Sequence, residues 1–199
     1  MTGTGVRLHA DALRLLRAWT APDPRQEQLR RRYVRHLEDH ADGVLRGCFP
    51  DHLTASSLIV SADAAQVLLT LHAKAGAWFQ TGGHCEATDT TLAGAALREA
   101  VQESGIDGLV LDPQPVQLDC HEVGFCDPRG AVRHLDVRFL AVAAPDAVQA
   151  VSAESLDVRW WPADALPTDE PSLRNLVRLA RARLALTDIV SISRPIRRG

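Results

Sequence analysis

The sequence predicts a layered α/β/α fold, in which a sheet lies between helices on its two faces. Two observations carry this prediction. Stretches with helical spacing of apolar residues stand near the beginning, the middle and the end of the chain, and apolar runs with strand character lie between them. The tetrapeptide Asp127-Pro128-Arg129-Gly130, a strong turn signal, separates two of these runs and predicts a β-hairpin.

Two helices are expected before residue 50. Residues 6–19 carry apolar side chains at helical spacing, and prolines at 22 and 24 end that helix. A second helix is predicted over 24–45, with a stripe of Leu29, Tyr33, Leu37 and Ala41. We interpret this pair as an extension that packs on the main domain, and a homodimer contact is the alternative.

Strands and a central helix follow. Strand character covers 53–61, 66–72 and 77–80, and a turn is expected at Gly82-Gly83. A helix is predicted over 91–104, with its N-cap at one of residues 89–91 and Gly105 as its C-cap. Further strands are predicted over 116–125, 132–142 and 158–161, and a last helix over 172–186. The resulting division is an extension at 1–50, a main domain at 51–187 and a tail at 188–199.

Composition limits the classes of partner. The chain has 199 residues, of which 46% are apolar and 24% charged, with a net charge of −3. This balance gives no reason to expect nucleic acid or a membrane surface as a partner. Since no apolar run reaches the about 18–20 residues of a membrane span and no signal peptide is recognisable, we expect a cytoplasmic protein with reduced cysteines.

The central helix carries the most informative residues. Glu99 and Glu103 are one helical turn apart, so their carboxylates project from the same side. Two carboxylates held this close repel each other unless a cation lies between them. Hard oxygen ligands of this kind suit Mg²⁺ or Mn²⁺, which bridge protein carboxylates to substrate phosphates.

Together with the glycines upstream, these residues resemble the signature of the Nudix hydrolase family, G-x5-E-x7-R-E-U-x-E-E-x-G-U, where U is aliphatic. The matching positions are Gly83, Arg98, Glu99, Ala100, Glu103, Gly105 and Ile106. There are three departures. Asp89 replaces a glutamate, one extra residue precedes Arg98, and Gln102 replaces the first glutamate of the E-E pair. The resemblance implies an α/β/α sandwich with a mixed sheet.

The resemblance also implies a metal-dependent pyrophosphohydrolase that cleaves a diphosphate linkage in a nucleoside diphosphate derivative or related small diphosphate. Glu99 and Glu103 would be the catalytic metal ligands, assisted by the Gly82 carbonyl and the Gln102 amide oxygen. Arg98 would orient the helix by pairing with Asp89 or Glu86.

Gln102 leaves alternatives open, because an amide brings no charge to the metal. Either the enzyme works with fewer ions or an acid from elsewhere, for which Glu86 and Glu154 are candidates, or the domain binds a ligand without hydrolysing it. The resemblance also allows a metal-dependent isomerase acting on a small diphosphate.

Candidate substrate contacts lie outside the helix. His134, Asp136 and Arg138 alternate along one strand, so all three point to one face, where Arg138 is a candidate for binding phosphate. His84, beside the glycines, and Trp78, before them, are further candidates. The alternative for the strand is a half-exposed sheet with a local ion pair. A zinc site from His84, Cys85, Cys120 and His121 is not expected, because these residues lack zinc-binding spacing.

Overall fold

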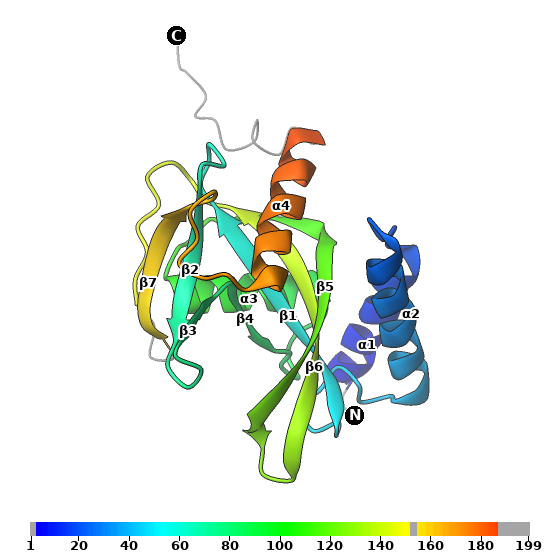
Figure 1. Ribbon diagram of the computed structural model, residues 1–199. Coiled ribbons are helices and arrows are strands. Elements are labelled where there is room, and N and C mark those ends of the chain that lie inside the picture. The colour runs from blue at the N-terminus through cyan, green and yellow to red at the C-terminus, as the bar shows by residue number, and fades with distance from the viewer. Residues whose placement is uncertain (1–2, 152–154, 187–199) are drawn as a thin grey trace.

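The computed structural model describes residues 3–151 and 155–186, in which a seven-stranded mixed sheet lies between helices (Figure 1). The helices are α1 (Gly3–Ala18), α2 (Pro24–Asp39), α3 (Leu92–Ser104) and α4 (Pro171–Leu186). The strands are β1 (Asp51–Val60), β2 (Gln66–His72), β3 (Ala77–Phe79), β4 (Thr81–His84), β5 (Val110–Asp127), β6 (Gly130–Val142) and β7 (Ser155–Pro162). The predicted α/β/α fold with a mixed sheet is confirmed.

Strand β1 organises the sheet. The strand order is β3-β2-β1-β6-β5, with β4 also paired to β1 and β7 to β2. Only the β1–β6 pair is parallel among the pairs of the described strands. Strand β4 pairs with the middle of β1, residues 54–57, and β2 pairs with the end of β1, residues 59–60, so both lie along the same edge of β1. This register places His52 opposite His134 and Thr54 opposite both Asp136 and His84.

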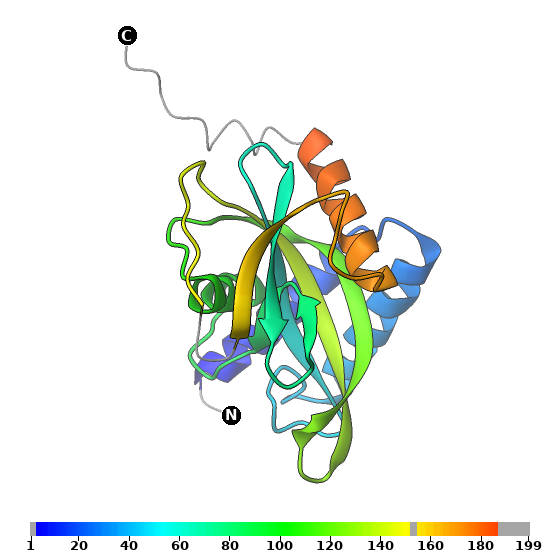
Figure 2. The ribbon, with the colours of Figure 1, turned by 60° about the vertical axis from the view of Figure 1, so that its left-hand side comes forward.

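The two faces of the sheet are covered differently, as Figures 1 and 2 show. Helix α4 packs on one face, against a core that includes Leu58 and Leu140. Helices α1, α2 and α3 cover the other face, over Leu53, Val137 and Phe139. The alternation along β6 follows the prediction, because its apolar residues at 135, 137 and 139 point to one core while Asp136 and Arg138 point to the opposite face.

The N-terminal helices pack on the main domain. Tyr33 and Leu37 of the predicted stripe are buried in the same core as the sheet residues. The Gln26 side chain accepts a hydrogen bond from the backbone N–H of Leu118 (2.6 Å) and donates one to the Leu118 carbonyl (2.9 Å). Strand β5 is the last in the sheet order, so α2 covers part of its outer edge. The indole N–H of Trp19 adds a bond to the carbonyl of Pro115 (2.7 Å).

Several boundaries differ from the sequence prediction, and β5 begins at Val110, six residues before its predicted start. Helix α2 ends at Asp39, six residues before the predicted end, and Ala41 of the stripe is exposed. The glycines at 82 and 83 belong to strand β4, which pairs with β1. The described residues include no helix long and apolar enough to cross a membrane.

Candidate metal and diphosphate site

Strand β4 brings its backbone close to other chain segments, and glycine is the residue that permits it. A Cβ added to Gly82, whose φ is +155°, would lie 2.2 Å from the Cβ of Ser56. A Cβ on Gly83 would lie 2.8 Å from Oε1 of Glu99. Heavy atoms that are not bonded do not approach this closely. The two glycines therefore let β4 lie between β1 and the carboxylates of α3.

Helix α3 presents its two glutamates to this strand. Thr91 caps the helix by accepting a bond from the Gly94 N–H, and Gly105 ends it in the left-handed conformation. The carboxylate Oε2 of Glu103 accepts a hydrogen bond from the N–H of Gly82 (2.9 Å), and Glu103 is only 7% exposed. The Glu99 carboxylate lies beside Gly83. The predicted carboxylate pair is therefore held against the glycine backbone.

Arg98 joins the helix to the segment before it. Its guanidinium forms a two-bond pair with Asp89, from Nε to Oδ1 (3.1 Å) and from Nη2 to Oδ2 (2.9 Å). Nη1 also donates to Oε1 of Glu99 (2.9 Å), and Nη2 donates to the carbonyl of His84 (3.0 Å). The hydrogen bonds to Asp89 and Glu99 raise the pKa of Arg98. Its partner among the predicted acids is mainly Asp89, because Glu86 is 3.4 Å away and half exposed.

The residues that depart from the signature have definite places. Gln102 is exposed at the helix surface, and its amide oxygen accepts a hydrogen bond from Nη1 of Arg98 (3.0 Å). Gln102 is thus tied to the same guanidinium as Glu99. The candidate acid Glu86 lies at the edge of this cluster, whereas Glu154 lies outside the described residues.

The chemistry of this donor set fits a hard divalent cation. One turn of α3 supplies the carboxylates of Glu99 and Glu103 and the amide oxygen of Gln102, and the backbone of β4 lies beside the two carboxylates. All of these side chains offer oxygen as the ligand atom. Mg²⁺ and Mn²⁺ prefer oxygen ligands of this kind. The carboxylates of Glu99 and Glu103 would hold the ion, while Arg98 fixes the orientation of Glu99.

A family model, described as the NUDIX domain, matches residues 50–180, which is more than half of the chain. The chain belongs to the NUDIX family. A search of curated proteins found no match.

Solved structures with the NUDIX fold are similar to this chain. The NUDIX domain of Shewanella oneidensis NrtR, complexed with ADP ribose, is 24% identical (TM-score 0.52, covering 66% of this chain and 87% of that one). A C. elegans Ap4A hydrolase is 19% identical (TM-score 0.53; 68% and 98%). The E. coli dihydroneopterin triphosphate pyrophosphohydrolase is 21% identical (TM-score 0.52; 65% and 95%). At these identities the likeness shows the fold.

The candidate substrate residues of this NUDIX domain lie on the sheet face opposite α3. Arg138 is buried and donates hydrogen bonds to Asp136 (2.8 Å) and Asp119 (3.0 Å). Burial opposes its charge, yet these carboxylates raise the pKa of Arg138. Thr54 and Ser56 donate to the same Asp136 carboxylate. The arginine proposed for phosphate is therefore already paired within a buried polar network.

The remaining candidates lie in two other places. Trp78 packs edge-to-face against Trp161, with ring centroids 5.3 Å apart, beside the core under α4. His84 and His134 lie together, with ring centroids 5.0 Å apart, and are joined by His52 and Cys126. Neither His52 nor Cys126 was predicted as a site residue. The parallel register of β1 and β6 brings His52 beside His134, and one sequence does not reveal it, whereas Cys126 approaches His134 through the β5–β6 hairpin.

Proposed function

We propose that this NUDIX protein is a divalent-metal-dependent hydrolase that cleaves a diphosphate linkage in a nucleoside diphosphate derivative or a related small diphosphate. The observation that supports the proposal best is the pairing of Glu99 and Glu103 against the backbone of Gly82 and Gly83. Glu103 is buried and Glu99 nearly so, and two carboxylates this close repel each other. A cation bound between them would offset this repulsion.

When bound, Mg²⁺ or Mn²⁺ would neutralise phosphate charge and generate or orient the attacking water. The chain's own residues set the geometry. Gly82 holds one oxygen of Glu103 through its N–H, and Arg98 holds one oxygen of Glu99. Arg98 is in turn fixed by Asp89 and the His84 carbonyl. Hydrogen bonds of this kind to the metal ligands fix the orientation of the carboxylates before substrate binds.

The experiment is a measurement of product release from a panel of compounds: nucleoside triphosphates, ADP-ribose, dinucleoside polyphosphates and small diphosphates, each with Mg²⁺ and with Mn²⁺. We expect turnover of at least one class. Glu103→Gln should lower it at least about 100-fold, since loss of even an outer-sphere partner of a metal typically costs 10–100-fold. The control Glu122→Gln makes the same change on the exposed surface of β5 and should retain activity. Equal activity of the two variants would contradict the proposal.

A ligand-binding domain without hydrolysis is the second candidate, and one observation favours it. The amide at position 102 removes a charge from the site, and its oxygen is bonded to Arg98. This candidate predicts that ADP-ribose or another compound of the panel raises the melting temperature without product formation. Product formation that depends on Glu103 would exclude it.

A further inference from the structure

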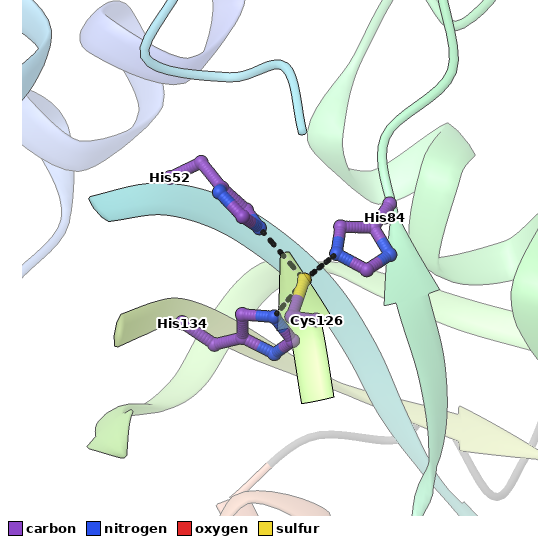
Figure 3. Close-up of side chains that lie close together, drawn as sticks. All are labelled: His52, His84, Cys126 and His134. Atoms are coloured by element: carbon purple, nitrogen blue, oxygen red, sulfur yellow. Dashed lines mark hydrogen bonds between the residues drawn. The ribbon is translucent and has the colours of Figure 1, made fainter. Parts of the chain in front are cut away.

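Four side chains from four strands converge on the sheet face opposite α3. They are His52 at the start of β1, His84 at the end of β4, Cys126 at the end of β5 and His134 on β6. One potential ligand atom of each lies within 4.8 Å of all the others. Figure 3 shows the three imidazoles arranged around the sulfur of Cys126. We infer that these residues form a binding site for one Zn²⁺ ion with closed tetrahedral coordination.

The distances match such a site. Zn–N bonds of about 2.0–2.1 Å and a Zn–S bond of about 2.3 Å, arranged tetrahedrally, place nitrogen and sulfur about 3.5 Å apart. The Cys126 Sγ lies 3.3 Å from Nε2 of His84, 3.4 Å from Nε2 of His134 and 3.9 Å from Nε2 of His52. The same nitrogen of each ring therefore faces the sulfur at about the required separation.

Hydrogen bonding explains this arrangement less well than a metal does. Nδ1 of His52 lies 3.0 Å from the carbonyl of Cys48, which can only accept, so Nδ1 carries the proton and the lone pair of Nε2 faces the cluster. The thiol can donate its single proton to one ring only, so the other two contacts would need ring N–H groups to donate to sulfur, which is a weak acceptor. A cation at the centre would satisfy all of them. The contact between His52 and a carbonyl is also the usual outer-sphere support of a zinc-bound imidazole.

The burial of the rings is compatible with metal binding, because it disfavours the protonated imidazole and a neutral imidazole is the form that binds metal. Burial, with smaller contributions from the neighbouring histidines and Arg46, lowers the pKa of His84 to about 4 and that of His134 to about 3. Burial also lowers the pKa of His52. Arg46, which donates to the Cys126 carbonyl (2.8 Å), is the arginine near the cluster. Three neutral imidazoles and one thiolate are a set that favours zinc over Mg²⁺.

Four protein ligands would leave no coordination position for water, so the proposed zinc site is structural and not catalytic. Its ligands connect the end of the β5–β6 hairpin to the starts of β1 and β6 and to β4. His84 contributes its imidazole to this site, and its backbone carbonyl accepts a hydrogen bond from Arg98 of α3. The zinc site would therefore also fix a backbone group that positions Arg98.

The test is metal analysis of the full chain without a polyhistidine tag, followed by Co²⁺ titration of the metal-free protein in excess Mg²⁺. We expect one zinc per chain, and with cobalt a thiolate charge-transfer band and tetrahedral ligand-field bands. Cys126→Ser should lose the charge-transfer band and bind zinc at least about 100-fold more weakly. Cys120→Ser, which changes a thiol outside the cluster, and Glu103→Gln, which changes the oxygen site, should both retain the band.

Three results would overturn the inference: wild-type protein without the charge-transfer band, a band that survives Cys126→Ser, or a band lost in Cys120→Ser. If Cys126→Ser does not fold, His134→Asn decides. It keeps the thiolate and should weaken zinc binding to a similar extent, and unchanged affinity in this variant would refute the site. A chelator should also lower the melting temperature of wild-type protein and not that of a folded Cys126→Ser variant.

Discussion

The two clusters along β4 differ in the atoms that they offer. Around Gly82 and Gly83, the side chains of α3 supply oxygen, and the strand contributes only backbone. At the next residue, the imidazole of His84 lies close to ring nitrogens and a sulfur from three other strands. Oxygen selects hard ions such as Mg²⁺, and imidazole with thiolate selects zinc. Residues 82–84 of this short strand therefore border both proposed ion sites: the glycines contribute backbone alone to one, and His84 contributes its side chain to the other.

The largest effect is expected from Gly83→Ala, which should damage the oxygen site alone. The new Cβ would lie within 3 Å of the Glu99 carboxylate and must displace it. Because misplacement by about 1 Å costs on the order of 100-fold in rate, we expect kcat/KM to fall by about that factor. Zinc content should not change. Gly124→Ala, where a Cβ meets nothing within 4 Å, is the matched control. Loss of zinc in Gly83→Ala would contradict the separation of the two sites.

A smaller effect is expected from Arg98→Lys, which replaces a side chain that contacts both regions, through Glu99 and the His84 carbonyl. Lysine cannot reproduce the two-bond pair with Asp89. We expect kcat to fall at least about tenfold, the lower limit for loss of outer-sphere support at a metal. Arg159→Lys, on an exposed ion pair, should have no effect. Full activity of Arg98→Lys would show that the guanidinium does not position Glu99.

Much of the fold follows from local sequence, whereas the second cluster depends on long-range pairing. Strand β2 was predicted with its observed ends, and α3 differs by one residue at its start, because apolar runs and caps are local signals. The glycines of β4 were predicted as a turn. They form a strand because pairing with β1 satisfies their backbone, and the absence of side chains allows the close approach to Ser56 and Glu99.

For the site, the spacing of Glu99 and Glu103 was readable from the sequence, and so was an ion pair of Arg98 with Asp89 or Glu86, because all lie within one helix and the segment before it. The four residues of the proposed zinc site were not. His52 and His134 are 82 positions apart and become neighbours only through the parallel register of β1 and β6. The rejected set with Cys85 does not assemble, since Cys85 points into the core under α3.

Gln102→Glu would add a negative charge beside Glu99 and Glu103 and leave the cluster around Cys126 unchanged. The position is exposed, so water and salt screen the added charge. We expect Mg²⁺ to bind about tenfold more tightly, with zinc affinity unchanged, as measured by calorimetry. Gln114→Glu, on an exposed residue of β5, controls for net charge. Equal Mg²⁺ affinity in both variants would mean that position 102 does not face the ion.

The smallest effect concerns His121, which borders the nitrogen and sulfur cluster. Burial opposes its charge, but the hydrogen bond with Asp119 (2.9 Å) and nearby Asp136 raise the pKa of His121. A raised folded-state pKa adds stability below about pH 6.5, and that stability is lost as the pH rises through the folded pKa. His121→Gln should therefore destabilise the protein near pH 6, by at most about 1 kcal/mol after solvent screening, and not near pH 8.

The control for this variant is His40→Gln, whose ring contacts His36 and not a carboxylate. NMR titration of the metal-free protein should show His121 protonating above the usual range, while His84 and His134 stay neutral down to about pH 4 and 3. A destabilisation of His121→Gln that grows towards alkaline pH would have the wrong sign.

The contact between Gln26 and strand β5 has a consequence for self-association. An unpaired outer strand is a template on which another chain can add its own strand. At Leu118 the amide side chain of Gln26 occupies both the N–H and the carbonyl, as a neighbouring strand would, and Trp19 occupies the carbonyl of Pro115. Removing the first two helices would therefore open this edge to aggregation as well as expose the core beneath it.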